Sequence, residues 1–293
     1  QGKNFANKIW NAFRLVQSWV VDDNLLPCKT ASVGLGWYSA KFQQTLATID
    51  DHFEKYRISD ALMATYKLIW DDFCSWLLEI VKPAYGSSID VETYQKVCAL
   101  FEDNLKLLHP FMPFLSEELW HAFKARSKEE ALIVSIWPKQ QENDSNLLEQ
   151  FEHTAELISQ LRTIRKKQNI TFKEPLNILE TSNDEISLRP IVQKLVNVSS
   201  WQRIASAPKQ ALSFRVNALE YFVPVAVSNL KEERRKIEEE LDYQQGFLKA
   251  VRKKLSNERF VANAPEQVVD LEHKKATGAE EKIVALKSRL DSL

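Results

Sequence analysis

Apolar residues recur at helical spacing over the first 125 residues. Residues three and four apart lie on one face of a helix, so each recurring set predicts one amphipathic helix. The first set is Ile9, Trp10, Phe13, Val16 and Val20, and further sets occupy residues 42–53, 61–80 and 90–108. A fifth, shorter helix is predicted after Pro113 with Ser116 as its N-cap. Residues 1–146 are therefore predicted to form a helical bundle.

Residues 147–228 have a different pattern. A helix is predicted from Leu147 to Lys167 and a second near 188–196. Short β-prone runs occur at 176–179, 200–204, 213–216 and 221–227. This region is predicted to form a small α+β domain.

Residues 229–293 carry the apolar spacing of a coiled coil. In the first half the repeat steps by three, four and seven through Leu230, Ile237, Leu241, Leu248, Val251 and Leu255. The run Asn263-Ala264-Pro265-Glu266 combines a capping residue, a first-turn proline and an acidic residue, which indicates that a second helix starts here. An antiparallel coiled-coil hairpin is predicted, and the whole chain is predicted to be mostly α.

Composition sets the broad class of protein. The 293 residues are 44% hydrophobic, with 39 Lys and Arg against 40 Asp and Glu, which is typical of a soluble chain with several cores. The three cysteines form no Cys-x-x-Cys pair, and no apolar run is long enough for a membrane span. A cytoplasmic location without a membrane or zinc site is expected. Because the chain starts at Gln1 with neither Met nor a signal sequence, we expect a fragment of a longer protein.

Catalytic motifs are missing from the sequence. It contains no phosphate-binding loop, dinucleotide fingerprint, His-Glu-x-x-His or Gly-x-Ser-x-Gly motif, and its five histidines are scattered. No catalytic residue, metal ligand or cofactor is expected in this chain.

Basic residues gather in three places that could contact phosphates. Lys8, Asn11 and Arg14 share one side of the first helix, and Arg162, Arg165 and Lys166 share a face of the helix that ends at Lys167. The third group surrounds the predicted hairpin tip and consists of Lys249, Arg252, Lys253, Lys254, Arg259, Lys274 and Lys275. Helix-dipole compensation at residues 162–167 and an ordinary solvated face elsewhere are the alternatives. Trp37 and Tyr38, in a predicted glycine-containing loop, are candidates for base stacking.

Three segments resemble a known family. Residues 2–14, GKNFANKIWNAFR, resemble the first anticodon-domain helix of the class I aminoacyl-tRNA synthetases for valine, isoleucine and leucine. Residues 108–120, LHPFMPFLSEELW, are similar to a bundle segment of the same enzymes. Residues 255–269, LSNERFVANAPEQVV, resemble the coiled-coil tip of the valyl-tRNA synthetase family.

The resemblance implies a division of labour. The bundle would hold the anticodon stem and loop of the valine tRNA, the α+β domain would brace it, and the arm would reach the tRNA elbow. By resemblance, Lys8, Asn11, Arg14, Arg162 and Arg165 are RNA-contact candidates, with Arg57 and Lys67 as weaker ones. The parent enzyme would join valine to tRNA with ATP and Mg²⁺, while the catalytic and editing domains of the same chain would lie upstream of this fragment.

A non-enzymatic adaptor is the alternative. A helical bundle whose charged coiled coil associates with another protein or with itself would explain the apolar seams equally well. The mass in solution separates the two, because a hairpin folded on itself is expected to be a monomer.

Overall fold

The computed structural model describes residues 2–181, 188–208, 211–224, 227–256 and 266–291, and it divides into two compact units. The first unit comprises residues 1–159 and 185–196, and the second comprises residues 160–184 and 197–293. The division falls within a long helix, α7 (Ser145–Lys167). The predicted domain limits at 146/147 and 228/229 stay predictions.

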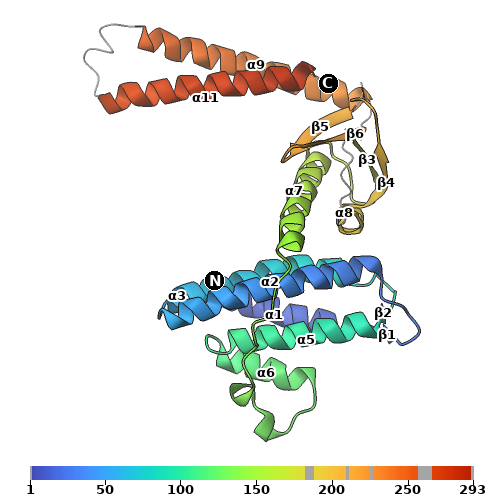
Figure 1. Cartoon of the computed structure of the whole chain (residues 1–293). Helices are drawn as coiled ribbons and strands as arrows, with labels where there is room; N and C mark the ends of the chain where they lie inside the picture. Colours follow the sequence, from blue (N-terminus) through green and yellow to red (C-terminus); the bar gives the residue numbers. More distant parts are fainter. Residues whose placement is uncertain (1, 182–187, 209–210, 225–226, 257–265, 292–293) are drawn as a thin grey trace. The chain divides into compact units, whose positions relative to one another are not determined.

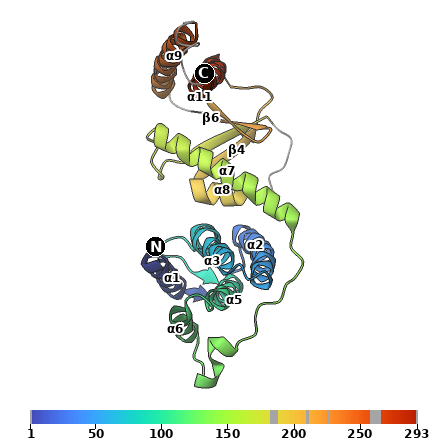
Figure 2. The ribbon, with the colours of Figure 1, turned by 90° about the vertical axis from the view of Figure 1, so that its left-hand side faces the viewer.

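The first unit is built on a bundle whose helices are seen end-on in Figure 2. Its long helices are α1 (Gly2–Gln17), α2 (Lys29–Glu54), α3 (Ile58–Lys67), α5 (Val91–Leu108) and α6 (Pro113–Phe123). Ile9 and Val16 of the predicted apolar face of α1 are buried, whereas Val20 lies beyond the helix and is exposed. Leu46 and Ile49 are fully buried on α2. The predicted helical bundle is confirmed.

The third predicted helix is continuous but changes its hydrogen bonding midway. After α3 the chain forms a π-helix, η1 (Leu68–Leu77), and then the short α4 (Leu78–Val81). In a π-helix each N–H bonds to the carbonyl five residues earlier, which widens the turn. The Ser75 hydroxyl donates to the Trp70 carbonyl at 2.9 Å, and it accepts from the Lys8 ammonium at 2.8 Å. A repeat of 3.6 residues could not predict this change.

The predicted glycine-containing loop around Trp37 and Tyr38 is wrong, because Gly34 and Gly36 lie inside a helix. Helix α2 starts earlier, at Lys29, and the Cys28 sulfur caps it by accepting from the Ala31 N–H. Trp37 and Tyr38 lie inside this helix with only 2% and 0% of their surface exposed. They are therefore core residues. A side chain with so little exposed surface has no face on which a nucleotide base could stack, so the stacking prediction is wrong.

The predicted N-cap of α6 is also wrong. The helix begins at Pro113, which suits a first position because its missing N–H would have no helical partner. Ser116 is buried inside the helix, with its hydroxyl 2.9 Å from the Met112 carbonyl and 2.8 Å from His109 Nδ1.

Two further helices and two short 3-10 turns complete the first unit. The turns are η2 (Lys128–Glu130) and η3 (Leu132–Val134), and the helices are the first half of α7 and α8 (Arg189–Val196). Phe151 of α7 stacks on Trp37 with a ring-centroid distance of 3.6 Å. Lys194 of α8 donates to the carbonyls of Ile80 and Lys82, at 2.6 and 2.7 Å, and so caps the end of α4.

The second unit contains a four-stranded sheet of order β4-β3-β6-β5. Its strands are β3 (Leu176–Glu180), β4 (Val198–Arg203), β5 (Ala211–Val216) and β6 (Leu219–Pro224). β3 and β4 are parallel, while β6 pairs antiparallel with β3 and β5. Asn217, at a φ of 52°, sits in the two-residue turn between β5 and β6. The predicted small sheet is confirmed.

The second unit also contains the arm, formed by α9 (Val227–Leu255) and α11 (Glu266–Asp291), which lie side by side in Figure 1. Arg252 pairs with Glu280 at 2.7 Å, and Lys254 lies 4.0 Å from Glu272. The residue numbers of these pairs rise along α9 while they fall along α11, so the two helices are antiparallel, as predicted. Ile237, Val251, Ala276 and Ala279 are buried along its seam. The predicted restart at Asn263 and Pro265 lies outside the described residues, whereas Glu266 is the first residue of α11.

The described part of the chain has no helix with the length and apolar character needed to cross a membrane. In the same residues, no group of three His, Cys, Asp or Glu side chains is placed to bind a metal ion.

Candidate RNA-binding surfaces

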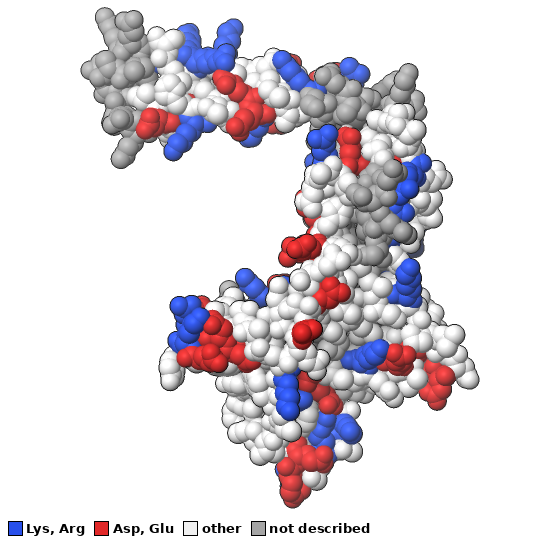
Figure 3. All heavy atoms as spheres, viewed as in Figure 1, with Lys and Arg blue, Asp and Glu red and all other residues white. Residues whose placement is uncertain are grey.

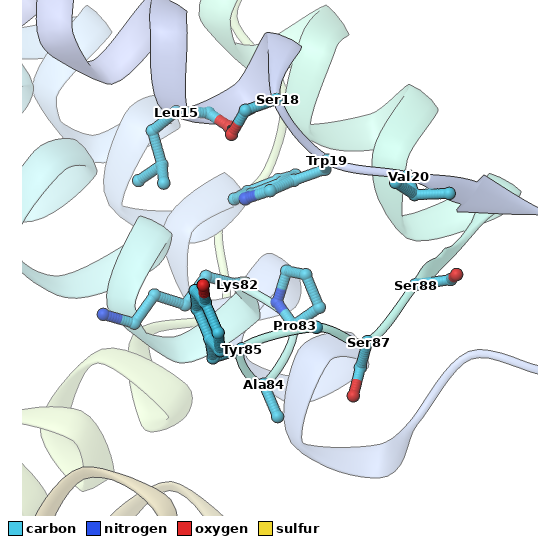
Figure 4. Close-up of a pocket in the computed structure, with 11 residues that line it drawn as sticks. Leu15, Ser18, Trp19, Val20, Lys82, Pro83, Ala84, Tyr85, Ser87 and Ser88 are labelled. Carbon is cyan, nitrogen blue, oxygen red and sulfur yellow. The ribbon is translucent and has the colours of Figure 1, made fainter.

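A cleft of about 550 Å³ opens at the end of the bundle where α1 and α4 stop. Two segments that are distant in sequence, residues 15–20 and 82–88, line it (Figure 4). Its volume falls in the range of about 300–1,000 Å³ that is typical of ligand pockets. None of its lining residues was a candidate from the sequence.

The backbone around the cleft is held in place by a strand pair, a helix cap and a turn. β1 (Val21–Asp22) pairs in parallel with β2 (Ile89–Asp90), and the Ile89 N–H donates to the Val20 carbonyl at 2.8 Å. Asp90 is buried and caps α5 by accepting from the Thr93 N–H at 2.8 Å. Gly86 turns the second segment at a φ of 77°, where a residue with a side chain would be strained. The two walls of the cleft therefore keep a fixed spacing.

The cleft presents aromatic rings, a cation and hydroxyl groups. Figure 4 shows the Trp19 ring reaching across it toward Pro83 and Tyr85. Trp19 is half-buried, while Tyr85 is fully exposed. Lys82, Ser87 and Ser88 also line the cleft, and the Lys82 ammonium pairs with Glu79 at 2.7 Å. Exposed aromatic faces beside a cation are the groups that bind unpaired nucleotides in proteins.

The predicted row on α1 divides into two environments. Arg14 is exposed in the last turn of α1, and its carbonyl accepts from the N–H of Ser18, a cleft residue, at 3.0 Å. Asn11 is exposed one turn earlier. Lys8 is half-buried, because its ammonium donates to Ser75 and lies 4.2 Å from the centre of the Trp70 ring. Arg14 thus lies one turn before the cleft-lining Ser18, with its guanidinium 5.9 Å from the centre of the Trp10 ring, whereas Lys8 is held against η1.

Arg57 and Lys67, the weaker candidates, flank α3. Arg57 precedes the first residue of this helix, Lys67 is its last residue, and both are exposed. Neither of them lines the cleft.

The basic group at the end of α7 contains one buried member. Arg162 and Lys166 are exposed, but only 6% of the Arg165 surface is. The Arg165 guanidinium donates to the carbonyls of Thr171 and Asn197 at 2.7 and 3.1 Å. Burial lowers the pKa of this guanidinium, and nearby Glu174 partly opposes the shift. Arg165 therefore has a structural role, which the charge pattern could not reveal, and we exclude it from the proposed RNA surface.

Basic residues of the arm are exposed, and several have acidic partners. Lys249, Lys253 and Lys274 are exposed, as are Arg252, Lys254 and Lys275. Arg252 pairs with Glu280, and Lys275 pairs at 2.8 Å with Glu272, which Lys254 also approaches. On the face of the arm shown in Figure 3, blue and red side chains alternate. Arg259 lies outside the described residues.

Trp19, Lys82 and Tyr85 are the cleft residues that sequence reasoning missed. In the sequence, Lys82-Pro83 and Gly86-Ser87-Ser88 indicate only the end of a helix. One feature of the sequence could have indicated the cleft. Trp19 and Tyr85 are aromatic residues outside the helical repeats, and each follows the end of a helix.

Comparison with known proteins gives matches over most of the chain. Residues 36–180 match the family described as the anticodon-binding domain of tRNA ligase, and residues 229–293 match the valyl-tRNA synthetase tRNA-binding arm. The chain is 50% identical to a valine–tRNA ligase of Christiangramia forsetii, 43% to that of Parabacteroides distasonis and 44% to that of Phocaeicola vulgatus. In each case the whole chain aligns with 34% of the relative.

The helical bundle thus matches the anticodon-binding domain of tRNA ligases, and the helical arm that follows matches the valyl-tRNA synthetase tRNA-binding arm. The chain belongs to the valyl-tRNA synthetase family and corresponds to the C-terminal part of these ligases. It spans about a third of the length of the relatives that it matches.

Proposed function

We propose that this chain binds the tRNA for a valine–tRNA ligase, with anticodon nucleotides in the bundle cleft and the arm against the tRNA elbow. The observation that carries the proposal is the cleft, where Trp19 and Tyr85 offer ring faces beside Lys82. Unpaired bases of an RNA loop can stack on such rings and be read at their edges.

In this proposal, phosphates and bases are held by different residues. Arg14, in the last turn of α1, and Lys82, in the cleft wall, supply positive charge for the loop backbone. Contacts to the backbone fix the register of the RNA, while the bases in the cleft provide specificity. Ser87 and Ser88 carry hydroxyls that can donate to or accept from base edges.

The arm and the end of α7 contribute mainly charge. Lys249, Lys253 and Lys274 are exposed along the arm, and Arg162 and Lys166 are exposed on α7. Their contribution falls as salt rises, because phosphate neutralisation releases counterions. A role of the arm as a protein adaptor has less support. Ile237, Val251 and Ala276 are already buried within the hairpin, so they offer no apolar surface to another protein.

The ligation of valine to its tRNA is proposed for the whole ligase, in the cytoplasm and as a monomer. ATP and Mg²⁺ are proposed for its catalytic domain, and no residue of this chain is assigned a step of that reaction. The catalytic and editing domains of the same ligase chain are proposed as its protein partners.

Substitutions in the cleft test the proposal. Base stacking contributes about 1–3 kcal/mol per base, so Trp19→Ala or Tyr85→Ala should weaken binding of valine tRNA by about 5-fold to 150-fold. The matched control is Tyr56→Asn, which removes an exposed tyrosine outside the cleft, at a φ of 57° that Asn tolerates. Equal affinities for the wild type and both cleft variants, measured by filter binding, would refute the proposal.

A further inference from the structure

A cluster of exposed apolar side chains lies on the α6 and η3 side of the bundle. Phe114, Ile133, Val134 and Ile136 expose 91%, 74%, 68% and 78% of their surface. Three of them come from one short segment around η3. We call these four residues the apolar rim. Pro113, the neighbour of Phe114, and Ile133 line one cavity, so the start of α6 and the η3 segment lie close together. Large exposed apolar patches on a soluble protein mark interaction sites.

The segment that carries the apolar rim is rigidly attached to the bundle. Leu132 is buried, and its N–H donates to both carboxylate oxygens of Glu117, at 3.0 and 3.1 Å. The Trp120 indole donates to the Glu130 carbonyl at 2.8 Å, and the Trp137 indole donates to Asp50 at 3.0 Å. These contacts fix the backbone on both sides of η3. The rim side chains are therefore held outward by the fold.

A cavity of about 440 Å³ opens beside the apolar rim. Pro110, Pro113, Ile133 and Trp137 are among the residues that line it. An apolar side chain of a partner could enter such a cavity, as the central anchors of protein interfaces do.

The position of the apolar rim relative to the start of α1 indicates which part of the protein covers the rim. Phe5 packs on Tyr66 at 4.7 Å, and Lys8 reaches Ser75, so α1 runs in the same direction as α3 and η1. Helix α1 therefore begins at the end of the bundle where α3 begins, opposite the cleft. Figure 2 looks onto this end.

The apolar rim belongs to the same end of the bundle. Phe53, in the last turn of α2, packs on Phe111 at 6.0 Å and on Trp137 at 6.1 Å. The residues that follow it, at the start of α3, include the exposed Ile58. The rim, the α2–α3 turn and the entry of the chain into α1 thus share one end.

We propose that the apolar rim and its cavity are a docking surface for the part of the ligase chain that precedes α1. The relatives are about three times as long as this chain, which aligns with their C-terminal part, so that preceding part is large. It enters the bundle at the end that carries the rim, so it is available there at high local concentration. RNA is the weaker candidate, because the four rim side chains have no charge or hydrogen-bonding group for a phosphate. In the cavity, Lys106 is paired with Asp103 at 2.8 Å and His109 contacts Ser116.

Thiol labelling of the full-length ligase that carries this chain tests the proposal. Val134→Cys is introduced into the 293-residue chain and into the full-length ligase, and labelling at that peptide is followed by mass spectrometry. The matched control is Val284→Cys on α11, since Val284 and Val134 have the same exposure of 68%. Peptide mapping separates both sites from Cys28, which is exposed. We expect labelling of the Val134→Cys variant to be at least tenfold slower in the full-length ligase, with labelling of the Val284→Cys variant unchanged.

Three results would overturn the proposal. Equal labelling of the Val134→Cys variant in the short and full-length chains would show that the preceding part leaves the apolar rim open. Protection in the 293-residue chain that grows with its concentration would identify a second copy as the occupant. Protection that requires added tRNA would identify RNA. Each readout is independent of tRNA binding by the cleft, so this inference and the proposed function can fail separately.

Discussion

A substitution at Arg165 tests whether this basic residue stabilises the fold or binds RNA. Its guanidinium is buried and donates to two backbone carbonyls, those of Thr171 and Asn197. Hydrogen bonds from a charged donor contribute about 1.5–3 kcal/mol each, and the removal of a buried charge offsets part of their loss. Arg165→Leu should therefore lower the free energy of unfolding by about 2–4 kcal/mol.

The assay compares Arg165→Leu with Lys166→Ala, a change at the neighbouring exposed residue. Stability is measured by urea unfolding followed by circular dichroism, and tRNA affinity is measured without urea, where both variants are folded. Lys166→Ala should change stability by less than about 1 kcal/mol, since only a favourable charge near a helix C-terminus is lost. An Arg165→Leu protein that keeps wild-type stability but loses as much tRNA affinity as Lys166→Ala would refute the structural role.

Three further predictions concern the core of the bundle. Burial raises the pKa of Asp72 from 3.8 to about 6, and the positive charge of Lys41 partly opposes this shift. Ionisation of the Asp72 carboxyl therefore lowers the stability of the folded protein as pH rises from 3.8 through about 6. Asp72→Asn should therefore gain up to about 3 kcal/mol over wild type between pH 4 and pH 8 in urea unfolding; a pH-independent difference would contradict this. Tyr38→Phe should cost about 1–3 kcal/mol, because the Tyr38 hydroxyl donates to the buried Asn104 at 2.8 Å; an unchanged urea midpoint would contradict this. Gly34→Ala should lower the melting temperature, since its methyl group would lie 2.5 Å from Ile80 Cγ2, whereas the matched Gly36→Ala has 3.6 Å of space and should not; equal melting temperatures would contradict this.

The helices and strands were predictable where one face of an element is buried. Ile9 and Val16 on α1, and Ile237 and Val251 on α9, are apolar at helical spacing and are all buried. Gly34 misled the interpretation, because a glycine is also required where two helices approach closely. The π-helix η1 carries an apolar pattern that fits an ordinary helix, so the sequence did not distinguish the two.

The candidate site was less predictable than the fold. The cleft joins residues that follow α1 with residues that follow α4, more than sixty positions later, and no local pattern links them. Arg162, Arg165 and Lys166 share a helical face in the sequence, yet only Arg165 is buried, because the Thr171 and Asn197 carbonyls lie within its reach. Burial of a cation depends on such distant partners, which charge spacing does not report.

The most direct test of the account measures the affinity of the 293-residue chain for three RNAs at fixed salt. These are valine tRNA, the same tRNA with an altered anticodon, and an unrelated tRNA. We predict that valine tRNA binds most tightly, that the altered anticodon weakens binding, and that Trp19→Ala removes this difference. Equal affinity of the wild-type chain for all three RNAs would contradict the claim that its cleft holds the anticodon.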